Sequence, residues 1–333
     1  MDKANEKIAP KISGYELGAE IGRGGMSVVY SATSAKLKSL HAIKVFSVPE
    51  CRNKDALEKK FMSETRILAT LRHPNIVRVT DCGTADDGRL WCAMDLINGT
   101  TLAVRLAQPR PPTAGDIARW YRQIASALAL CHSKGIVHGD IKAENILIDE
   151  DGNALLSDFG ISRATGRKIR AQLDITNSTL PVALGTSYTL APECRNCTPP
   201  TFAADVYSFG VLLHKLVTGI WFDGSPRALD LLADYAPAWA PLVSQMLATN
   251  PDCRITDATQ LPNDAPQGQR QQADSSTAAD SSAPNGQLPW FKRKLFWCSV
   301  AFVVLAFLGY LLERQERQDA IEDEIRQHMF NQR

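Results

Sequence analysis

The sequence predicts an α+β body followed by a flexible linker and one C-terminal transmembrane helix, and three observations carry this prediction. Within Gly14–Ala258, apolar β-like runs alternate with stretches of helical periodicity and with turn residues. The stretch Asn263–Gln287 is rich in Ser, Ala, Gln, Asp and Pro and has almost nothing to bury. Beyond it, Leu295–Leu312 contains no charged residue, and its length is at the lower limit for a helix that crosses a bilayer.

The composition narrows the classes of protein to which the chain can belong. Its 333 residues could hold one large domain or two ordinary ones. The formal net charge of +1 argues against nucleic acid as the main partner, because nucleic-acid-binding domains carry basic surfaces. The eight cysteines are scattered along a long chain, which favours reduced thiols in a cytosolic body. Cys194 and Cys197 form a CxxC pair, but no second pair follows at zinc spacing, so loop cysteines are favoured over a metal site.

The apolar segment Leu295–Leu312 has the flanks of a membrane anchor. Aromatic side chains of the kind found at membrane interfaces stand near its ends: Trp290, Phe291, Trp297 and Tyr310. Residues 292–294 are all basic, whereas the charges beyond the segment are mixed, so the positive-inside rule keeps the N-terminal body in the cytoplasm. A buried core helix is the alternative, but a polar linker and a charged tail surround this segment. We therefore predict a single-pass C-terminal anchor in the lipid bilayer; residues 1–13 show no secretory signal.

A glycine-rich segment, IGRGGMSVVYSA, spans Ile21–Ala32. The β-like runs Tyr15–Ile21 and Ser27–Ala32 enclose its glycines. Because glycines carry no Cβ atom, a glycine-rich hairpin lets its backbone N–H groups approach phosphate oxygens. Because glycine turns between strands are common, this signal is weak by itself.

A second strand-like run, HAIKVF, places Lys44 in an apolar setting. A buried lysine is costly unless it is paired, so a carboxylate or a phosphate should lie nearby. The following segment, 57–71, has helical periodicity, and one face of that helix comprises Phe61, Thr65, Leu68 and Leu71. Glu64 falls near this face. A solvated glutamate is the alternative, but because Lys44 needs a partner we predict a Lys44–Glu64 ion pair.

The segment IVHGDIKAENILI, Ile136–Ile148, sets polar residues close together among apolar ones. Asp140 is placed to accept a proton or to orient an alcohol, and Lys142 can neutralise charge on a transferring phosphoryl group. Asn145 offers an amide oxygen, and Asp158 ends an apolar strand-like run with a carboxylate. Both are hard ligands suited to Mg²⁺. Such a set catalyses by positioning and by electrostatic stabilisation.

Taken in order, these motifs resemble those of the eukaryotic-type (Hanks-type) protein kinase family, in its serine/threonine branch. The motifs are the glycine-rich loop, AIK, the helix glutamate, HGDIKAEN, DFG, APE and DVYSFG, and they cover roughly Ser13–Ala258. The resemblance implies a bilobal protein-kinase fold, with an N-lobe of antiparallel β-sheet plus the αC helix and a mostly helical C-lobe. It implies a kinase domain over 13–260. The composition adds a disordered linker over 261–291, the transmembrane helix over 295–312 and a short extracytoplasmic tail over 313–333. The compact body favours a bacterial, membrane-anchored member.

The resemblance also implies roles for individual residues. Asp140 is similar to the catalytic base and acts with Lys142, and Asn145 and Asp158 resemble the metal ligands. The residues that the resemblance assigns to ATP are Ile21, Gly22, Gly24, Gly25, Ser27, Val29, Ala42, Lys44, Glu64, Met94, Asp95, Leu96 and Leu147. Met94 resembles the gatekeeper. The implied cofactors are ATP and Mg²⁺, with Mn²⁺ as a substitute.

Further matches concern the lower lobe and the reaction. Glu193 and Arg254 resemble an ion pair that ties the activation segment to the C-lobe, and Asp205 resembles the acid that steadies the catalytic loop. Lys142 and Thr186 match the serine/threonine branch. The implied reaction is transfer of the γ-phosphoryl group of ATP to Ser or Thr hydroxyls of protein substrates, in membrane-anchored signalling.

Two alternatives to an active kinase stay open. A pseudokinase keeps the fold without the reaction, but Lys44, Asp140, Asn145 and Asp158 are all present, which favours the enzyme. A membrane-tethered scaffold is compatible with either. A homodimer is also compatible with the resemblance.

Two positions depart from the family pattern. Ser27 stands where the third loop glycine is usual, and its small side chain should leave ATP binding intact. Gly139 stands where the family usually has an arginine that pairs with a phosphorylated residue of the activation segment. We therefore hypothesise that activity does not depend on phosphorylation of that segment; the alternative is that other cations replace the arginine. The candidate acceptors are Thr165, Thr176, Ser178 and Thr179, and the candidate cations are Arg163, Arg167, Lys168 and Arg170.

Overall fold

The computed structural model of this protein describes residues 9–25, 27–47, 54–159, 188–196 and 198–266. The predicted transmembrane helix Leu295–Leu312, most of the predicted linker and the candidate phosphorylation sites lie outside these residues. Among the helices that the structure describes, none is both long and apolar enough to cross a membrane.

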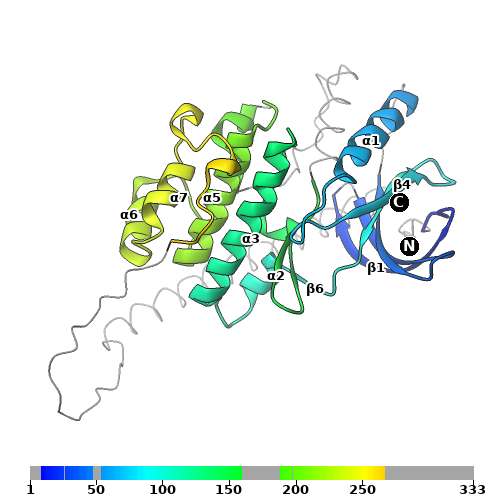
Figure 1. The fold of residues 1–333 in the computed structure, drawn as a ribbon, viewed down its shortest axis with the longest axis horizontal. Coiled ribbons are helices and arrows are strands. Elements are labelled where there is room, and N and C mark those ends of the chain that lie inside the picture. Colours follow the sequence, from blue (N-terminus) through cyan, green and yellow to red (C-terminus); the bar gives the residue numbers. More distant parts are fainter. Residues whose placement is uncertain (1–8, 26, 48–53, 160–187, 197, 267–333) are drawn as a thin grey trace, which may run out of the picture. The chain divides into compact units, whose positions relative to one another are not determined.

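An antiparallel five-stranded sheet forms the N-terminal lobe, with the strand order β1-β2-β3-β5-β4 (Figure 1). Its strands are β1 (Tyr15–Gly24), β2 (Ser27–Ser34), β3 (Leu40–Phe46), β4 (Val79–Thr84) and β5 (Leu90–Asp95). The strands predicted on either side of the glycines are therefore confirmed as β1 and β2. Side chains of β2 alternate between half-buried and buried along its whole length, as expected for a strand with one face in a core.

Helix α1 (Lys54–Leu68) packs against this sheet through the face that the sequence predicts. The buried residues of that face are Phe61, Thr65 and Leu68, and Leu71 follows just beyond the helix. Phe61 meets Phe46 of β3 edge to face, with ring centroids 5.2 Å apart. Such aromatic pairs stabilise packing by about 0.5–1.5 kcal/mol beyond the area that they bury, so α1 is fixed close to the strand that carries Lys44.

The C-terminal lobe is mostly helical. Its helices are α2 (Leu102–Ala107), α3 (Ala114–Ser133), α5 (Phe202–Thr218), α6 (Pro226–Tyr235) and α7 (Ala240–Met246). A three-stranded sheet consists of β6 (Gly99–Thr101), β7 (Ile146–Asp149) and β8 (Ala154–Leu156). Short 3-10 helices are η1 (Ala143–Asn145), η2 (Pro192–Asn196), η3 (Pro251–Cys253) and η4 (Ala258–Gln260). The bilobal fold with an antiparallel N-lobe sheet and a helical C-lobe is thus confirmed.

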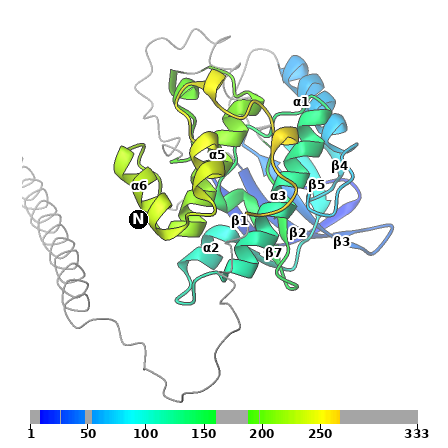
Figure 2. The same cartoon turned by 60° about the vertical axis from the view of Figure 1, so that its left-hand side comes forward.

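Helix α5 is the central element of the C-lobe, and it lies beside α3 (Figures 1 and 2). It is buried over most of its length, because its sequence is apolar on nearly every side, a pattern typical of a core helix. Tyr121 of α3 stacks on Phe209 of α5 with ring centroids 5.9 Å apart. A Cβ atom on Gly210 would lie 2.9 Å from the Cβ of Met246, so the glycine permits the close approach of α7.

The packed core continues past the predicted end of the domain at residue 260. Leu261 and Ala265 are buried, and the hydroxyl group of Tyr121 donates a hydrogen bond to the carbonyl of Pro262 at 2.8 Å. The first residues of the predicted linker, 261–291, therefore belong to the body. The composition of this stretch misled the prediction, because two apolar side chains and one hydrogen bond hold a segment that is otherwise polar.

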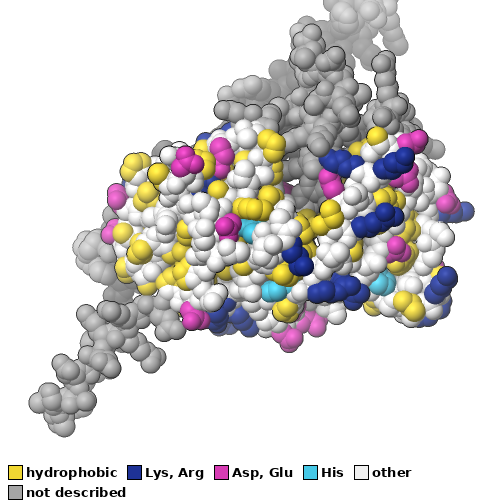
Figure 3. All heavy atoms as spheres, turned by 45° about the horizontal axis from the view of Figure 1, so that its top comes forward, with side chains coloured by type: hydrophobic (Ala, Val, Ile, Leu, Met, Phe, Trp, Pro, Cys, Tyr) yellow, Lys and Arg dark blue, Asp and Glu magenta, His cyan; other side chains and the backbone are white. Residues whose placement is uncertain are grey.

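Charge is distributed unevenly over the surface. On the face drawn in Figure 3, Lys and Arg side chains gather on the N-lobe side, whereas the C-lobe side shows more apolar surface. The basic side chains that gather on this part of the face favour the approach of anions there.

Candidate active site

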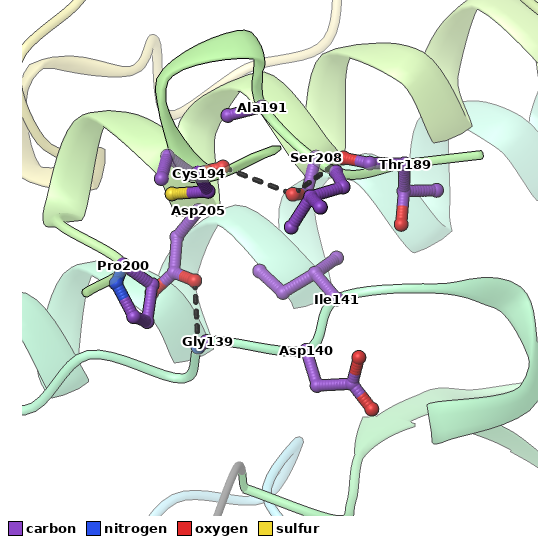
Figure 4. Close-up of a pocket in the computed structure, with 11 residues that line it drawn as sticks. Gly139, Asp140, Ile141, Thr189, Ala191, Cys194, Pro200, Asp205 and Ser208 are labelled. Carbon is purple, nitrogen blue, oxygen red and sulfur yellow. Dashed lines mark hydrogen bonds between the residues drawn. The ribbon is translucent and has the colours of Figure 1, made fainter. Parts of the chain in front are cut away.

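A buried carboxylate holds the loop that precedes Asp140. Asp205, in the first turn of α5 and 1% exposed, accepts hydrogen bonds from the backbone N–H groups of His138 (2.7 Å) and Gly139 (2.8 Å; Figure 4). The Nε2 atom of His132 lies 3.1 Å from the same carboxylate. A buried carboxylate is tolerated only where donors satisfy it, so α5 fixes this loop. The steadying role that the resemblance implied for Asp205 is confirmed.

Two buried histidines beside this carboxylate have tautomers that follow from their partners. Nδ1 of His132 accepts from the N–H group of Ala258 (2.9 Å), so its Nε2 carries the proton that faces Asp205. Nδ1 of His138 accepts from the N–H group of Asp140 (3.3 Å), and its Nε2 donates to the carbonyl of Ser157 (3.0 Å). Complete burial lowers the pKa of His138. His138 thus orients the loop directly, whereas His132 orients the carboxylate of Asp205.

Gly139 has a φ of +75°, in the left-handed region that glycine adopts without a steric cost. A Cβ atom there would lie 3.1 Å from Cγ of Pro200. Gly139 and Pro200 line a small pocket that also includes Asp140, Cys194 and Ser208 (Figure 4). A larger side chain at position 139 would therefore have to displace Pro200 or strain the loop.

Asp140 lies within reach of the two other residues of the predicted catalytic set. Nζ of Lys142 lies 2.9 Å from its Oδ2 atom. Nδ2 of Asn145 donates to the same oxygen (2.9 Å) and to the Asp140 carbonyl (2.7 Å), because η1 turns the chain back toward Asp140. The Asp140 side chain is 16% exposed. A carboxylate that is mostly buried but still partly exposed to solvent can be reached by a substrate alcohol and can accept its proton.

Lys44 pairs with Asp158 rather than with Glu64. Its Nζ lies 2.8 Å from Oδ1 of Asp158, across the two lobes, and its side chain is 12% exposed. Glu64 pairs instead with Lys60, one turn earlier on α1, at 3.3 Å. The predicted Lys44–Glu64 ion pair is therefore wrong for this structure. Lys60 competes locally for Glu64, and Asp158, with a φ of +58°, supplies the counter-charge that a largely buried lysine requires.

The ion pair predicted between Glu193 and Arg254 is confirmed. Nη1 and Nη2 of Arg254 donate to the two carboxylate oxygens of Glu193, at 2.7 and 3.2 Å. The Arg254 side chain is fully buried, and its guanidinium lies over the ring of Tyr207, 4.9 Å from the centroid. This pair attaches η2, which follows the segment 160–187, to the C-lobe core.

Comparison with known proteins identifies the architecture that carries these contacts. A model of the protein kinase domain matches residues 15–228. The chain belongs to the protein kinase family. The resemblance drawn from the motifs is thereby confirmed.

Bacterial serine/threonine kinases are among the relatives of this chain. It is 35% identical to serine/threonine-protein kinase PknE of Mycobacterium tuberculosis over 65% of its own length and 37% of that protein. It is 35% identical to serine/threonine-protein kinase PrkC of Bacillus subtilis over 72% of its own length and 37% of that protein. The kinase thus spans less than half the length of these relatives. Among solved structures, the PknI kinase domain of M. tuberculosis superposes with a TM-score of 0.57 at 26% identity, over 75% of this chain and 94% of that one.

Most of the residues that the resemblance assigned to ATP lie on the N-lobe sheet or on β7, and Glu64 lies on α1. The structure places Ile21, Gly22 and Gly24 on β1, Ser27 and Val29 on β2, Ala42 and Lys44 on β3, Met94 and Asp95 on β5, Glu64 on α1 and Leu147 on β7; Gly25 and Leu96 directly follow β1 and β5. In the strand register, Gly22 faces Val29 and Ala42 faces Met94. A Cβ atom on Gly25 would meet no atom within 4 Å, so the hairpin tip has open space around it.

The oxygen atoms of Asn145 and Asp158 suit the divalent metal that the kinase family implies. Asn145 gives its amide nitrogen to Asp140, and no donor within the described residues bonds its Oδ1 atom. Asp158 adds a carboxylate whose side chain is 31% exposed. An amide oxygen and a carboxylate are hard donors of the kind that suit a metal which keeps water molecules and binds phosphate oxygens.

Some functional positions were missed or lie outside the described part of the chain. The sequence analysis did not single out His132 and His138, although each interrupts an apolar run with a polar side chain, a signal of a satisfied buried group. Thr186 and Cys197 lie outside the described residues, so their predicted roles stay predictions.

Proposed function

We propose that this protein is an ATP-dependent serine/threonine protein kinase. The observation that carries the proposal is the carboxylate of Asp140, which Lys142 and Asn145 contact; the Lys44–Asp158 pair supplies the second half of the predicted set. Relatives named as serine/threonine-protein kinases at about one-third identity support it.

The residues divide the chemical work. When bound, Mg-ATP supplies the phosphoryl group, with Asn145 and Asp158 as the proposed Mg²⁺ ligands. Asp140 accepts the proton of the substrate hydroxyl, and the ammonium group of Lys142 beside it stabilises negative charge that develops there. Lys44 brings a second ammonium group to the phosphates. The glycine-rich hairpin offers backbone N–H groups to the phosphate oxygens.

Incorporation of labelled phosphate tests this proposal. The full chain, with labelled ATP, Mg²⁺ and a generic basic protein, should label Ser or Thr residues. Asp140→Asn should lower the rate by about a thousandfold, within the range expected for loss of a general base, and should keep the melting temperature. Equal labelling by the two proteins would contradict the proposal, and nucleotide binding without labelling in the wild type would favour the pseudokinase.

We further propose that turnover does not require phosphorylation of the segment between Asp158 and Glu193. Gly139 offers no cation to a phosphorylated residue, which is the reason for the proposal. Joint replacement of Thr165, Thr176, Ser178 and Thr179 by Ala should therefore leave turnover within about twofold of the wild type. A tenfold loss would show that other cations of the segment perform this task.

We also propose that Leu295–Leu312 anchors the kinase in a lipid bilayer, with the kinase domain in the cytoplasm and residues 313–333 on the other side. The uncharged sequence of this segment and the basic residues before it support the proposal. In fractionated cells, the full chain should sediment with membranes and resist extraction at high pH. Removal of residues 295–333 should release it to the supernatant; sedimentation of the shortened chain with membranes would contradict the anchor.

A further inference from the structure

We propose that an apolar shelf beside the catalytic loop selects an aliphatic or aromatic side chain of the protein substrate. The shelf consists of Tyr188, Ile220 and Trp221. This inference rests on the kinase function proposed above and adds to it a preference for substrates that carry an apolar side chain near the phosphorylated residue.

Two segments far apart in the sequence build the shelf. Tyr188 precedes η2, whereas Ile220 and Trp221 follow the end of α5. The rings of Tyr188 and Trp221 pack with centroids 4.1 Å apart at an interplanar angle of 52°. Tyr188 is 40% exposed and Ile220 is 48% exposed. Adjacent apolar side chains that stay exposed typically mark a contact surface, whereas a single exposed one does not.

A hydrogen bond connects the shelf to the catalytic loop. The Tyr188 hydroxyl donates to the carboxylate of Glu144, 3.1 Å from Oε2 and 3.3 Å from Oε1. Glu144 lies in η1, between Lys142 and Asn145, the two residues that contact Asp140. Burial first, and then the negative charge of Glu144, raises the pKa of Tyr188, so the hydroxyl stays protonated and keeps donating. A protein segment whose hydroxyl group reaches Asp140 therefore passes close to the shelf.

The charges around the shelf favour an apolar occupant over a basic one. Nζ of Lys215 already lies over the Trp221 ring, 5.6 Å from its centroid, and donates to the carbonyl of Gly219 at 2.5 Å. A second cation would meet this ammonium group, and the carboxylate of Glu144 is engaged by Tyr188. Among the described residues, the surface that stays open here is ring and hydrocarbon, which gains most from burying another apolar group.

Peptide phosphorylation by the full chain tests the inference. The substrates are pairs of peptides with one acceptor serine. The two peptides of a pair differ at a single position, which holds either Leu or Ser, and each pair places this position at a different distance before or after the acceptor. At one position, the wild type should prefer Leu by about tenfold in kcat/KM, a ratio within the range for one apolar group. Ile220→Ser and Trp221→Ala should each reduce that ratio to about twofold or less, through the KM for peptide and not the KM for ATP. A ratio near one at every position in the wild type, or an unchanged ratio in both variants, would overturn the inference.

A matched control separates the shelf from general surface effects. Tyr235, at the end of α6, is 69% exposed, and Tyr235→Ser should keep both the activity and the Leu preference of the wild type. Because Ile220 is half exposed, its replacement tests the shelf even where Trp221→Ala lowers the melting temperature. Uniform labelling of all peptides would overturn the shelf alone, whereas a wild type that labels neither peptides nor the generic protein would overturn the kinase function as well.

Discussion

Asp205→Asn should destabilise the protein by about 3–5 kcal/mol and slow turnover about a hundredfold. Three donors converge on this carboxylate, from His132, His138 and Gly139. An amide in its place offers one acceptor oxygen and turns an NH₂ group toward the remaining donors. Each buried group left without a partner costs about 1–3 kcal/mol, and more where charge is involved. Turnover falls because the loop that positions Asp140 loosens, and a misplacement of about 1 Å can cost a hundredfold.

Urea unfolding and steady-state kinetics measure the two effects separately. The matched control is Asp230→Asn, which removes the same charge from an exposed position on α6. The control should change the free energy of unfolding by less than about 0.5 kcal/mol, as is usual for surface substitutions. A loss below about 1 kcal/mol for Asp205→Asn would show that the loop is held by other contacts.

Glu193→Gln should destabilise the protein by about 3 kcal/mol at neutral pH. The guanidinium of Arg254 is fully buried and donates to the carbonyls of Ala203, Ala248 and Thr249 as well as to Glu193. Removing the carboxylate leaves this cation without a counter-charge. Breaking one side of a buried ion pair typically costs about 3–5 kcal/mol, and the remaining amide oxygen of Gln offsets a small part.

The effect of Glu193→Gln should depend on pH in a defined direction. Burial raises the pKa of Glu193, but its hydrogen bonds and the charge of Arg254 together outweigh burial and hold the pKa below its ordinary value of 4.5. The pair therefore contributes its full stabilisation above about pH 4.5, and the contribution disappears as the pH falls through the lower folded-state value. Unfolding free energies of wild type and variant should thus converge in acid.

The control for this pH dependence is Glu150→Gln, because Glu150 is exposed. Its unfolding curves should follow the wild type at every pH. A constant difference between wild type and Glu193→Gln down to pH 3 would exclude the ion pair as the cause.

Local patterns predicted the elements of this kinase well. The strand-like run Ser27–Ala32 and the inward face of α1 depend only on neighbours along the chain, and both are confirmed. The Glu193–Arg254 pair came from the family resemblance, since no local rule connects two residues so far apart in the sequence.

The partner of Lys44 was not predictable from the sequence. The chain offers two carboxylates, Glu64 and Asp158, and the choice depends on where α1 lies relative to the sheet and on competition from Lys60. Such a choice between two near-equal partners is decided by tertiary packing. The closeness of Pro200 to Gly139 was likewise unpredictable, because these two loops meet only in the folded chain.

The attachment of the last described residues has a mechanical consequence. The chain leaves the body behind α3, where Ala258 bonds to His132 and Pro262 bonds to Tyr121. Tension applied to the chain beyond residue 266 would act on these two hydrogen bonds and on the buried side chains of Leu261 and Ala265. The ring of His132 also faces Asp205, whose other partners are the N–H groups before Asp140. A pull strong enough to detach η4 would therefore free one side of a ring that takes part in holding the catalytic loop.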